Sequence, residues 1–197
     1  LLNKAGHKFP SGYPARRAWV ELQVSNQDGE TVFHSGAWDA ATGHIIGQED
    51  VAWEPHHDVI ADDQDVLIYE LVLGDVNGDP TTVLERANAH LKDNRLVPRG
   101  FTMDHAVYDT TAIVGQALMD ANFNLDEETE GTGTDRVSYL LPEGWEENSS
   151  LEVLCTVWYQ AIPPKWVAPM LSLQGDSLID GFRQLYAEFA PTPERIA

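Results

Sequence analysis

Apolar residues recur at every second position in the segment that follows residue 16 of this chain. Ala18, Val20, Leu22 and Val24 are the apolar positions, and they alternate with Trp19, Glu21 and Gln23. A period of two is typical of a strand with one buried face. A turn over 26–30 contains Gly29, and residues 31–35 then return, so the sequence predicts a β-hairpin over 17–35.

Three further segments predict strands. Residues 66–73 are almost continuously apolar, which favours a strand buried on both of its faces. Residues 136–140 and 151–160 predict two more strands on either side of a turn at 142–144. The two prolines within 162–166 are then expected to end the sheet.

Two segments carry apolar residues at helical spacing. Residues 81–92 predict a short helix, with Thr81 or Thr82 placed to cap its first turn. Residues 178–189 predict a C-terminal helix, whose apolar stripe we expect to pack against the core. Short strands, long loops and two helices together predict a mainly β fold, an antiparallel β-sandwich of Ig-like or jelly-roll kind. We expect one domain over residues 1–197.

Composition and charge narrow the classes of function. The hydrophobic content of 43% supports a real core, so we do not expect a disordered chain. The 32 acidic residues against 12 basic ones give a formal net charge of −20, which repels nucleic acid and anionic lipid. Cation binding, a basic partner and a salty environment all stay open.

The single cysteine, Cys155, lies in one of the predicted strands, so we expect a packed, buried thiol and no disulfide within the chain. No apolar run reaches the ~20 residues that a membrane helix needs. Residues 1–4 lack the hydrophobic region of a signal peptide. Because the first residue is not Met, we expect a processed or fragmentary chain.

The segment before the first strand is the best candidate for chemistry. Pro10 and Pro14 fix φ there, while Gly6 and Gly12 permit conformations that other residues avoid. His7 therefore lies on a stiff loop, and loops held on a scaffold are where functional residues concentrate. A neutral imidazole on such a loop can bind a metal with little loss of entropy.

Several segments in order along the chain resemble a known family. They are G-H-K-F-P-S-G-Y-P at 6–14, E-P-H-H-D-V-I at 54–60, I-Y-E at 68–70, G-D-V-N-G at 74–78 and K-D-N-R-L-V-P-R-G-F at 92–101. The first resembles the GHxxPTG-type segment that opens a β-rich domain in multihaem c-type cytochromes. One departure is large, because the chain contains no Cys-x-x-Cys-His and cannot attach a c-type haem covalently by itself.

The resemblance implies an exported, periplasmic or extracellular component of electron transfer that performs no bond chemistry. In this interpretation His7 is an axial ligand to the iron of a haem c held by another segment or a neighbouring chain. The resemblance also offers His56 as a second haem ligand or a partner of His7, and a structural or solvent-facing histidine is the alternative. One of Arg16 and Arg17 is expected to pair with a haem propionate, and pairing with surface carboxylates is the alternative.

An acidic turn supports a second hypothesis. Asp75, Asn77 and Asp79 place oxygen ligands at alternate positions, as at the start of a calcium loop. The glutamate expected at position 12 of an EF-hand falls on Arg86, so this is no EF-hand, and an ordinary turn is the alternative. The corresponding function is a calcium-dependent binding or adhesion module. An enzyme is not favoured, since no G-x-S-x-G nucleophile motif occurs.

Overall fold

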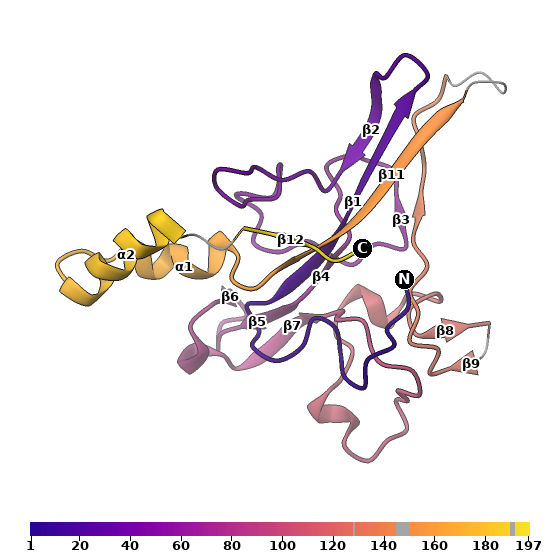
Figure 1. Cartoon of the computed structure of the whole chain (residues 1–197). Coiled ribbons are helices and arrows are strands. Elements are labelled where there is room, and N and C mark those ends of the chain that lie inside the picture. Colours follow the sequence, from indigo (N-terminus) through magenta and orange to yellow (C-terminus); the bar gives the residue numbers. More distant parts are fainter. Residues whose placement is uncertain (128, 145–149, 190–191) are drawn as a thin grey trace.

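The computed structural model describes residues 1–127, 129–144, 150–189 and 192–197. These form the predicted mainly β fold, together with two helices (Figure 1). The strands are β1 (Arg17–Asn26), β2 (Thr31–Ser35), β3 (Val59–Ile60), β4 (Ile68–Tyr69), β5 (Leu71–Gly74), β6 (Pro80–Thr81), β7 (Ala89–Asp93), β8 (Leu125–Asp126), β9 (Thr129–Glu130), β10 (Ser138–Tyr139), β11 (Leu151–Gln160) and β12 (Glu194–Arg195). The helices are α1 (Pro164–Leu171) and α2 (Ser177–Phe189), and 3₁₀ turns lie at Leu84–Arg86, Tyr108–Thr110 and Gln116–Leu118.

The largest sheet is built around β1. Its strand order is β12-β11-β1-β2, and β4 also pairs with β1. The predicted hairpin of β1 and β2 is confirmed, with Leu22 opposite Ser35 and a register shift after Val24. The strand predicted over 151–160 is confirmed as β11, which is antiparallel to β1 along its whole length, from Arg17↔Gln160 to Asn26↔Leu151.

The apolar segment 66–73 forms two short strands, β4 and β5, instead of one continuous strand. Strand β5 lies between β6 and β7 in a separate three-stranded sheet. The predicted helix over 81–92 is wrong, because this segment forms a 3₁₀ turn and then β7. Its apolar residues Val83 and Leu84 are exposed, so no packing supports a helix, whereas β7 gains a partner in β5.

Two apolar clusters make up the core. The larger one lies between β1 and the loops after β7; its buried members are Val20, Leu22, Val24, Phe33, Ile60, Leu67, Tyr69, Leu96, Val97, Ile113, Ala117 and Phe123. The smaller one is built on Trp19, Ile45, Val66 and Ile68, with Trp38 and Trp158 packed against it. These clusters fix the segment around residue 96, on which the N-terminal turn rests.

The C-terminal helix is confirmed as α2, but its predicted packing is wrong. None of its residues is buried, and its apolar side chains Leu178, Leu185 and Phe189 are 82%, 59% and 68% exposed. Figure 1 shows α1 and α2 as a pair that extends away from the sheets. Helix α1 was missed, although Pro164 occupies its first turn, where proline is favoured.

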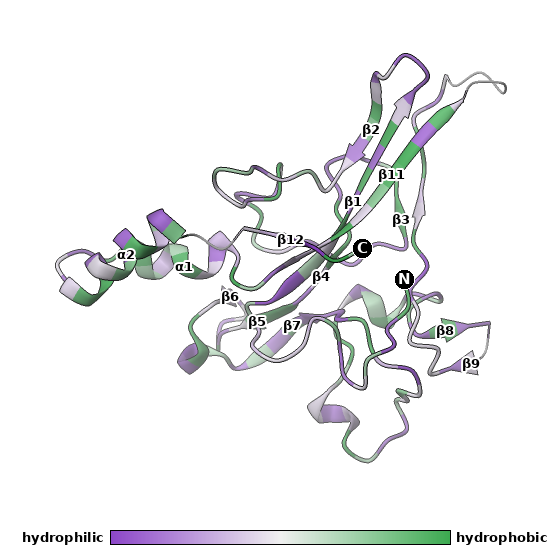
Figure 2. Ribbon diagram, viewed as in Figure 1, coloured by the Kyte–Doolittle hydropathy of each residue, from purple (hydrophilic) through white to green (hydrophobic). Residues whose placement is uncertain are grey.

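The prediction of a buried thiol is also wrong, since Cys155 is exposed. It lies in the first half of β11, where the neighbouring side chains of Val153 and Leu154 are each 58% exposed. Figure 2 shows apolar colour continuing along β11 into this end. The alternation in the sequence thus identified the strand correctly, but this end of the strand has little packed against it. Among the described residues, no helix is both long and apolar enough to cross a membrane.

Candidate functional site

The N-terminal turn, residues 3–12, is fixed to the strand-like segment around Leu96. Asn3 is buried, and its side-chain amide donates to the carbonyls of both His7 and Leu96, each at 2.8 Å. Phe9 and Leu96 exchange both of their backbone hydrogen bonds at 2.8 Å. The turn that carries His7 is therefore held from both of its sides, as expected for a preformed site.

His7 itself is exposed, and its tautomer follows from its hydrogen bond. Its Nδ1 lies 2.9 Å from the carbonyl oxygen of Lys8. A carbonyl only accepts, so Nδ1 carries the proton and Nε2 presents a lone pair. Backbone hydrogen bonds of this kind orient the imidazoles that bind metals in proteins. Nε2 makes no hydrogen bond to any described residue, so it is available as a ligand atom.

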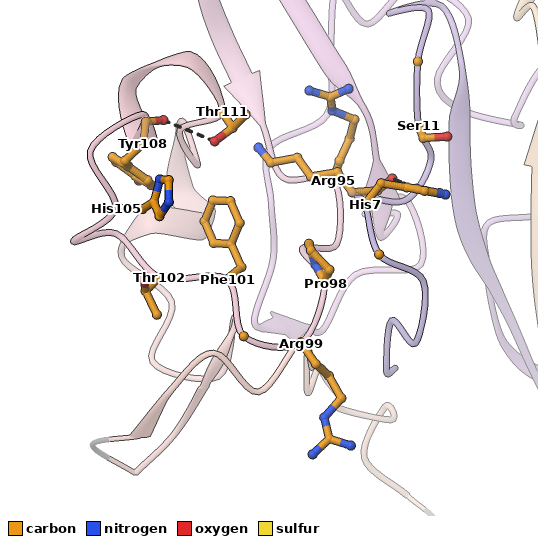
Figure 3. Close-up of a pocket in the computed structure, with 14 residues that line it drawn as sticks. His7, Ser11, Arg95, Pro98, Arg99, Phe101, Thr102, His105, Tyr108 and Thr111 are labelled. Atoms are coloured by element: carbon orange, nitrogen blue, oxygen red, sulfur yellow. Dashed lines mark hydrogen bonds between the residues drawn. The ribbon is translucent and has the colours of Figure 1, made fainter.

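His7 lies on the wall of a pocket of about 500 Å³, here called the His7 pocket (Figure 3). The pocket is lined by Gly6, His7, Lys8, Ser11, Gly12, Arg95, Pro98, Arg99, Gly100, Phe101, Thr102, His105, Tyr108 and Thr111. In Figure 3, His7 and Arg95 lie on one side, and Phe101, His105 and Tyr108 lie on the other. This volume is within the range of small-molecule sites.

The charge of the lining is opposite to that of the chain. Lys8, Arg95 and Arg99 line the pocket, and no aspartate or glutamate does, although acidic residues outnumber basic ones 32 to 12 in the sequence. Asp93, which lies behind this lining, binds two of the cations. It accepts from Lys8 Nζ at 2.8 Å and from Arg95 Nε and Nη2 at 2.8 Å each. The pocket thus keeps an excess of positive charge.

The segment 92–95, which contains Asp93 and Arg95, is also held in place by contacts of Lys92 and Asn94 with the interior. Lys92 Nζ, fully buried, donates to the carbonyl of Ile68 at 2.8 Å and lies 3.4 Å from Glu70 Oε1. Asn94 accepts from the backbone N–H of Glu70 and donates to the carbonyl of Ile68. These hydrogen bonds tie the segment 92–95 to Ile68 and Glu70, which lie in and just after β4.

Buried charges balance around Glu70. Burial alone would raise the pKa of Glu70, but the positive charges of Lys165, Lys92 and Arg17 outweigh it and lower that pKa to about 2. Burial lowers the pKa of Lys92 to about 8, against the attraction of Glu70. Lys165 Nζ donates to the second oxygen of Glu70 at 3.0 Å.

The structure places His56 in the core, apart from the lining of the His7 pocket. Its Nδ1 accepts from Asn94 Nδ2 at 3.0 Å, and its Nε2 lies 3.0 Å from Asp120 Oδ2. Because the other contacts of Asn94 fix its amide orientation, Nδ1 must accept and Nε2 must carry the proton. His56 therefore donates to Asp120 and offers no lone pair to a metal in this tautomer.

A third buried group, Asp135, completes the cluster around His56. Its Oδ2 accepts from the hydroxyl of Tyr69 and lies 3.9 Å from His56 Nε2. Burial raises the pKa of Asp135 to about 7, more than the hydrogen bond from Tyr69 lowers it. The cluster of His56, Asp120 and Asp135 has ligand types that suit a metal, but His56 Nε2 already donates its proton to Asp120. We interpret it as a structural hydrogen-bond network.

The two arginines expected near His7 separate. Arg16 Nη1 donates to the carbonyl of Ser11 at 2.8 Å and so braces the N-terminal turn. Arg17 is buried, where its Nε donates to Gln160 Oε1 at 3.0 Å, and burial lowers its pKa to about 10. Neither residue lines the His7 pocket, and the cations that do are Lys8, Arg95 and Arg99.

The acidic turn at 75–79 is closed by its own hydrogen bonds. Asp75 Oδ1 accepts from the backbone N–H groups of Asn77 at 2.8 Å and Asp79 at 3.1 Å. Hydrogen bonds from Asn77 and Asp79 lower the pKa of Asp75, more than burial raises it. These contacts are those of an ordinary Asx turn. Calcium binding at Asp75, Asn77 and Asp79 stays a prediction.

Sequence reasoning missed three lining residues. His105 belongs to none of the segments singled out in the sequence, yet it lines the pocket with His7. Arg95 and Arg99 belong to the segment 92–101 that carried the resemblance, and a cation-rich loop in so acidic a chain was the available signal. His105 Nδ1 accepts from the N–H of Val107 at 3.3 Å, which leaves Nε2–H as a donor.

Comparison with known proteins gives one distant similarity. No protein-family description and no curated protein sequence matches the chain. Among solved structures, the chain is similar to a penta-haem cytochrome c552 from Thermochromatium tepidum, with a TM-score of 0.37 and 14% sequence identity. The match covers 96% of this chain and 33% of that one, so the chain spans about a third of the cytochrome's length. A similarity this distant supports no conclusion about function.

Proposed function

We propose that this chain is a β-rich domain of an exported electron-transfer system of the multihaem c-type cytochrome kind. It would cap a haem c that belongs to another segment or a neighbouring chain, and present His7 to the haem iron. This proposal rests on the resemblance of the segments 6–14, 54–60 and 92–101 and on the geometry of the His7 pocket, described above.

The observation that carries the proposal is the exposure of the His7 ring together with its hydrogen bonding. Its ring is exposed, its Nδ1 proton is bound by the carbonyl of Lys8 at 2.9 Å, and its Nε2 lone pair meets no donor among the described residues. The hydrogen bonds of Asn3 hold the backbone of His7 in place before any ligand arrives. A ligand atom fixed in advance binds a metal with less loss of conformational entropy.

The lining of the pocket fits a haem. Phe101 and Pro98 offer apolar surface to a flat macrocycle, and the excess of positive charge suits the propionates at its edge. A bound haem would supply one-electron transfer, at a potential set in part by its axial ligand. The residues of this chain would hold the imidazole, exclude water from that face and position the two partners.

The proposal can be tested by titrating the purified chain with ferric protoporphyrin IX and recording the Soret band. Ligation by His7 should convert the iron to a histidine-bound spectrum, and His7→Ala should weaken this binding at least about tenfold. His90→Ala is the matched control, because His90 is also exposed and lies outside the His7 pocket. It should behave as the wild type does.

Two outcomes would contradict the proposal. One is a wild-type spectrum that stays that of unligated ferric porphyrin at saturating protein. The other is a histidine-bound spectrum that His7→Ala leaves unchanged, since the iron would then be bound by another residue. Circular dichroism of each variant checks that the fold is retained.

A further inference from the structure

The cations of the His7 pocket differ in whether they already form an ion pair with a described residue of the protein. Lys8 and Arg95 both bind Asp93, Arg95 through two hydrogen bonds of 2.8 Å. Lys8 also donates to the carbonyl of Ala112 at 3.0 Å. These two side chains are therefore committed to holding the walls of the pocket together. Arg99 makes no hydrogen bond or ion pair with any other part of the described chain.

Arg99 lies on a rigid part of the backbone although its side chain is exposed. The N–H of Phe101 donates to the carbonyl of Pro98 at 3.1 Å, which closes a turn with Arg99 and Gly100 at its corner. Gly100 has a φ of +81°, as the third position of a type II turn requires. The N–H of Gly100 donates to the carbonyl of Gly131 at 2.8 Å, and this anchors the turn.

A glycine packs closely behind the same turn. Gly133 has a φ of +67°, and a Cβ there would lie 2.7 Å from the backbone nitrogen of Arg99. The backbone of Arg99 is thus fixed from behind, and its long side chain extends at the edge of the pocket. Figure 3 shows the guanidinium of Arg99 turned away from Phe101 and from the other labelled side chains, so it does not lie over the Phe101 ring.

We infer that the His7 pocket recognises carboxylates on the edge of its ligand, and that Arg99 is the residue that binds them. This inference rests on the proposed function, in which the ligand is a haem and the carboxylates are its two propionates. A guanidinium presents a planar fork of donors that matches a carboxylate, and an unpaired one gains the full interaction. Arg99 thus takes the role that the sequence predicted for Arg16 or Arg17.

The test separates the carboxylates from the iron by using porphyrins without metal. Protoporphyrin IX carries both carboxylates and no iron, and its neutral diamide carries neither. Binding of each to the wild-type chain is followed by porphyrin fluorescence anisotropy at low salt. The wild type should bind the diacid about fivefold more tightly than the diamide, the ratio that an exposed ion pair provides.

Arg99→Gln should remove this preference and leave the affinity for the diamide unchanged. The matched control is Arg195→Gln, which removes another exposed arginine, outside the pocket, and should keep the preference. Raising the ionic strength should weaken diacid binding to the wild type and to Arg195→Gln, with much less effect on Arg99→Gln.

The inference is overturned if the wild type binds the diacid and the diamide equally, or binds neither, or if Arg99→Gln keeps the preference. These results are distinct from failure of the proposed function. Replacing His7 by alanine should leave the preference for the iron-free diacid intact. A carboxylate preference in a chain whose His7 does not bind iron would leave this inference standing and remove the axial ligand.

Discussion

The replacement Glu70→Gln tests the buried charges behind the His7 pocket. The cations around Glu70 lower its pKa from 4.5 to about 2, and the group is fully buried. A folded-state pKa below the unfolded value means that the charged form stabilises the fold above about pH 4.5. This contribution is lost as the pH falls through about 2. A difference of this size corresponds to about 3 kcal/mol at neutral pH.

The glutamine variant should therefore unfold about 3 kcal/mol more easily than the wild type at pH 7. As the pH is lowered from about 5 toward 2, the wild type loses the contribution of the glutamate and the two stabilities should converge. Urea denaturation followed by tryptophan fluorescence at several pH values measures both. Glu188→Gln, at an exposed position of α2, should differ from the wild type by less than about 0.5 kcal/mol.

A difference between wild type and Glu70→Gln that is the same at pH 3 and pH 7 would refute this reasoning, because no titration of Glu70 would then be involved. A difference below about 1 kcal/mol at pH 7 would refute it as well. In that case deprotonation of Lys92, whose pKa is already lowered to about 8, would have removed the unpaired charge at little cost.

Three further results are expected. Asn3→Ala removes the donor to two carbonyls, so it should lower the free energy of unfolding by about 2 kcal/mol in urea denaturation and weaken iron binding by His7. The exposed thiol of Cys155 should react with Ellman's reagent in the native chain as fast as in urea; a protected thiol would contradict the structure. Asp75→Ala should lower the melting temperature without added calcium, because it removes the two hydrogen bonds that close the turn. Calorimetric titration of the wild type and of this variant with calcium tests the predicted calcium site.

Local signals were sufficient for the longest strands. The alternation over 17–24 and the glycine turn after it identify β1 and β2 without further information, and the same holds for β11. The segment 81–92 shows where local signals fail. Its apolar spacing fits a helix, but pairing with β5 selects a strand, and such pairing depends on residues that are distant in the sequence.

Only part of the site could be predicted from the sequence, again because local signals do not report contacts between distant residues. The residue type and stiffness around His7 are local properties, so that candidate could be found. The opposite wall of the pocket comes from residues 95–111, about ninety positions away, and only folding brings it to His7. Arg16 and Arg17 show a finer limit. Arg16 precedes β1 and braces the turn, whereas Arg17 is the first residue of β1 and is buried.

The segment 92–95 explains how one short motif serves both the core and the pocket. Lys92 and Asn94 face Glu70 and His56, while Asp93 lies on the other side, behind the pocket lining, and binds Lys8 and Arg95. Alternation along an extended backbone produces this division. The contacts of Lys92 and Asn94 fix the position and orientation of the backbone. Asp93 is thereby held where it can bind the two cations. An acidic chain can keep a positively charged pocket in this way, because a single buried aspartate anchors two cations, and Arg99 forms an ion pair with none of the described residues.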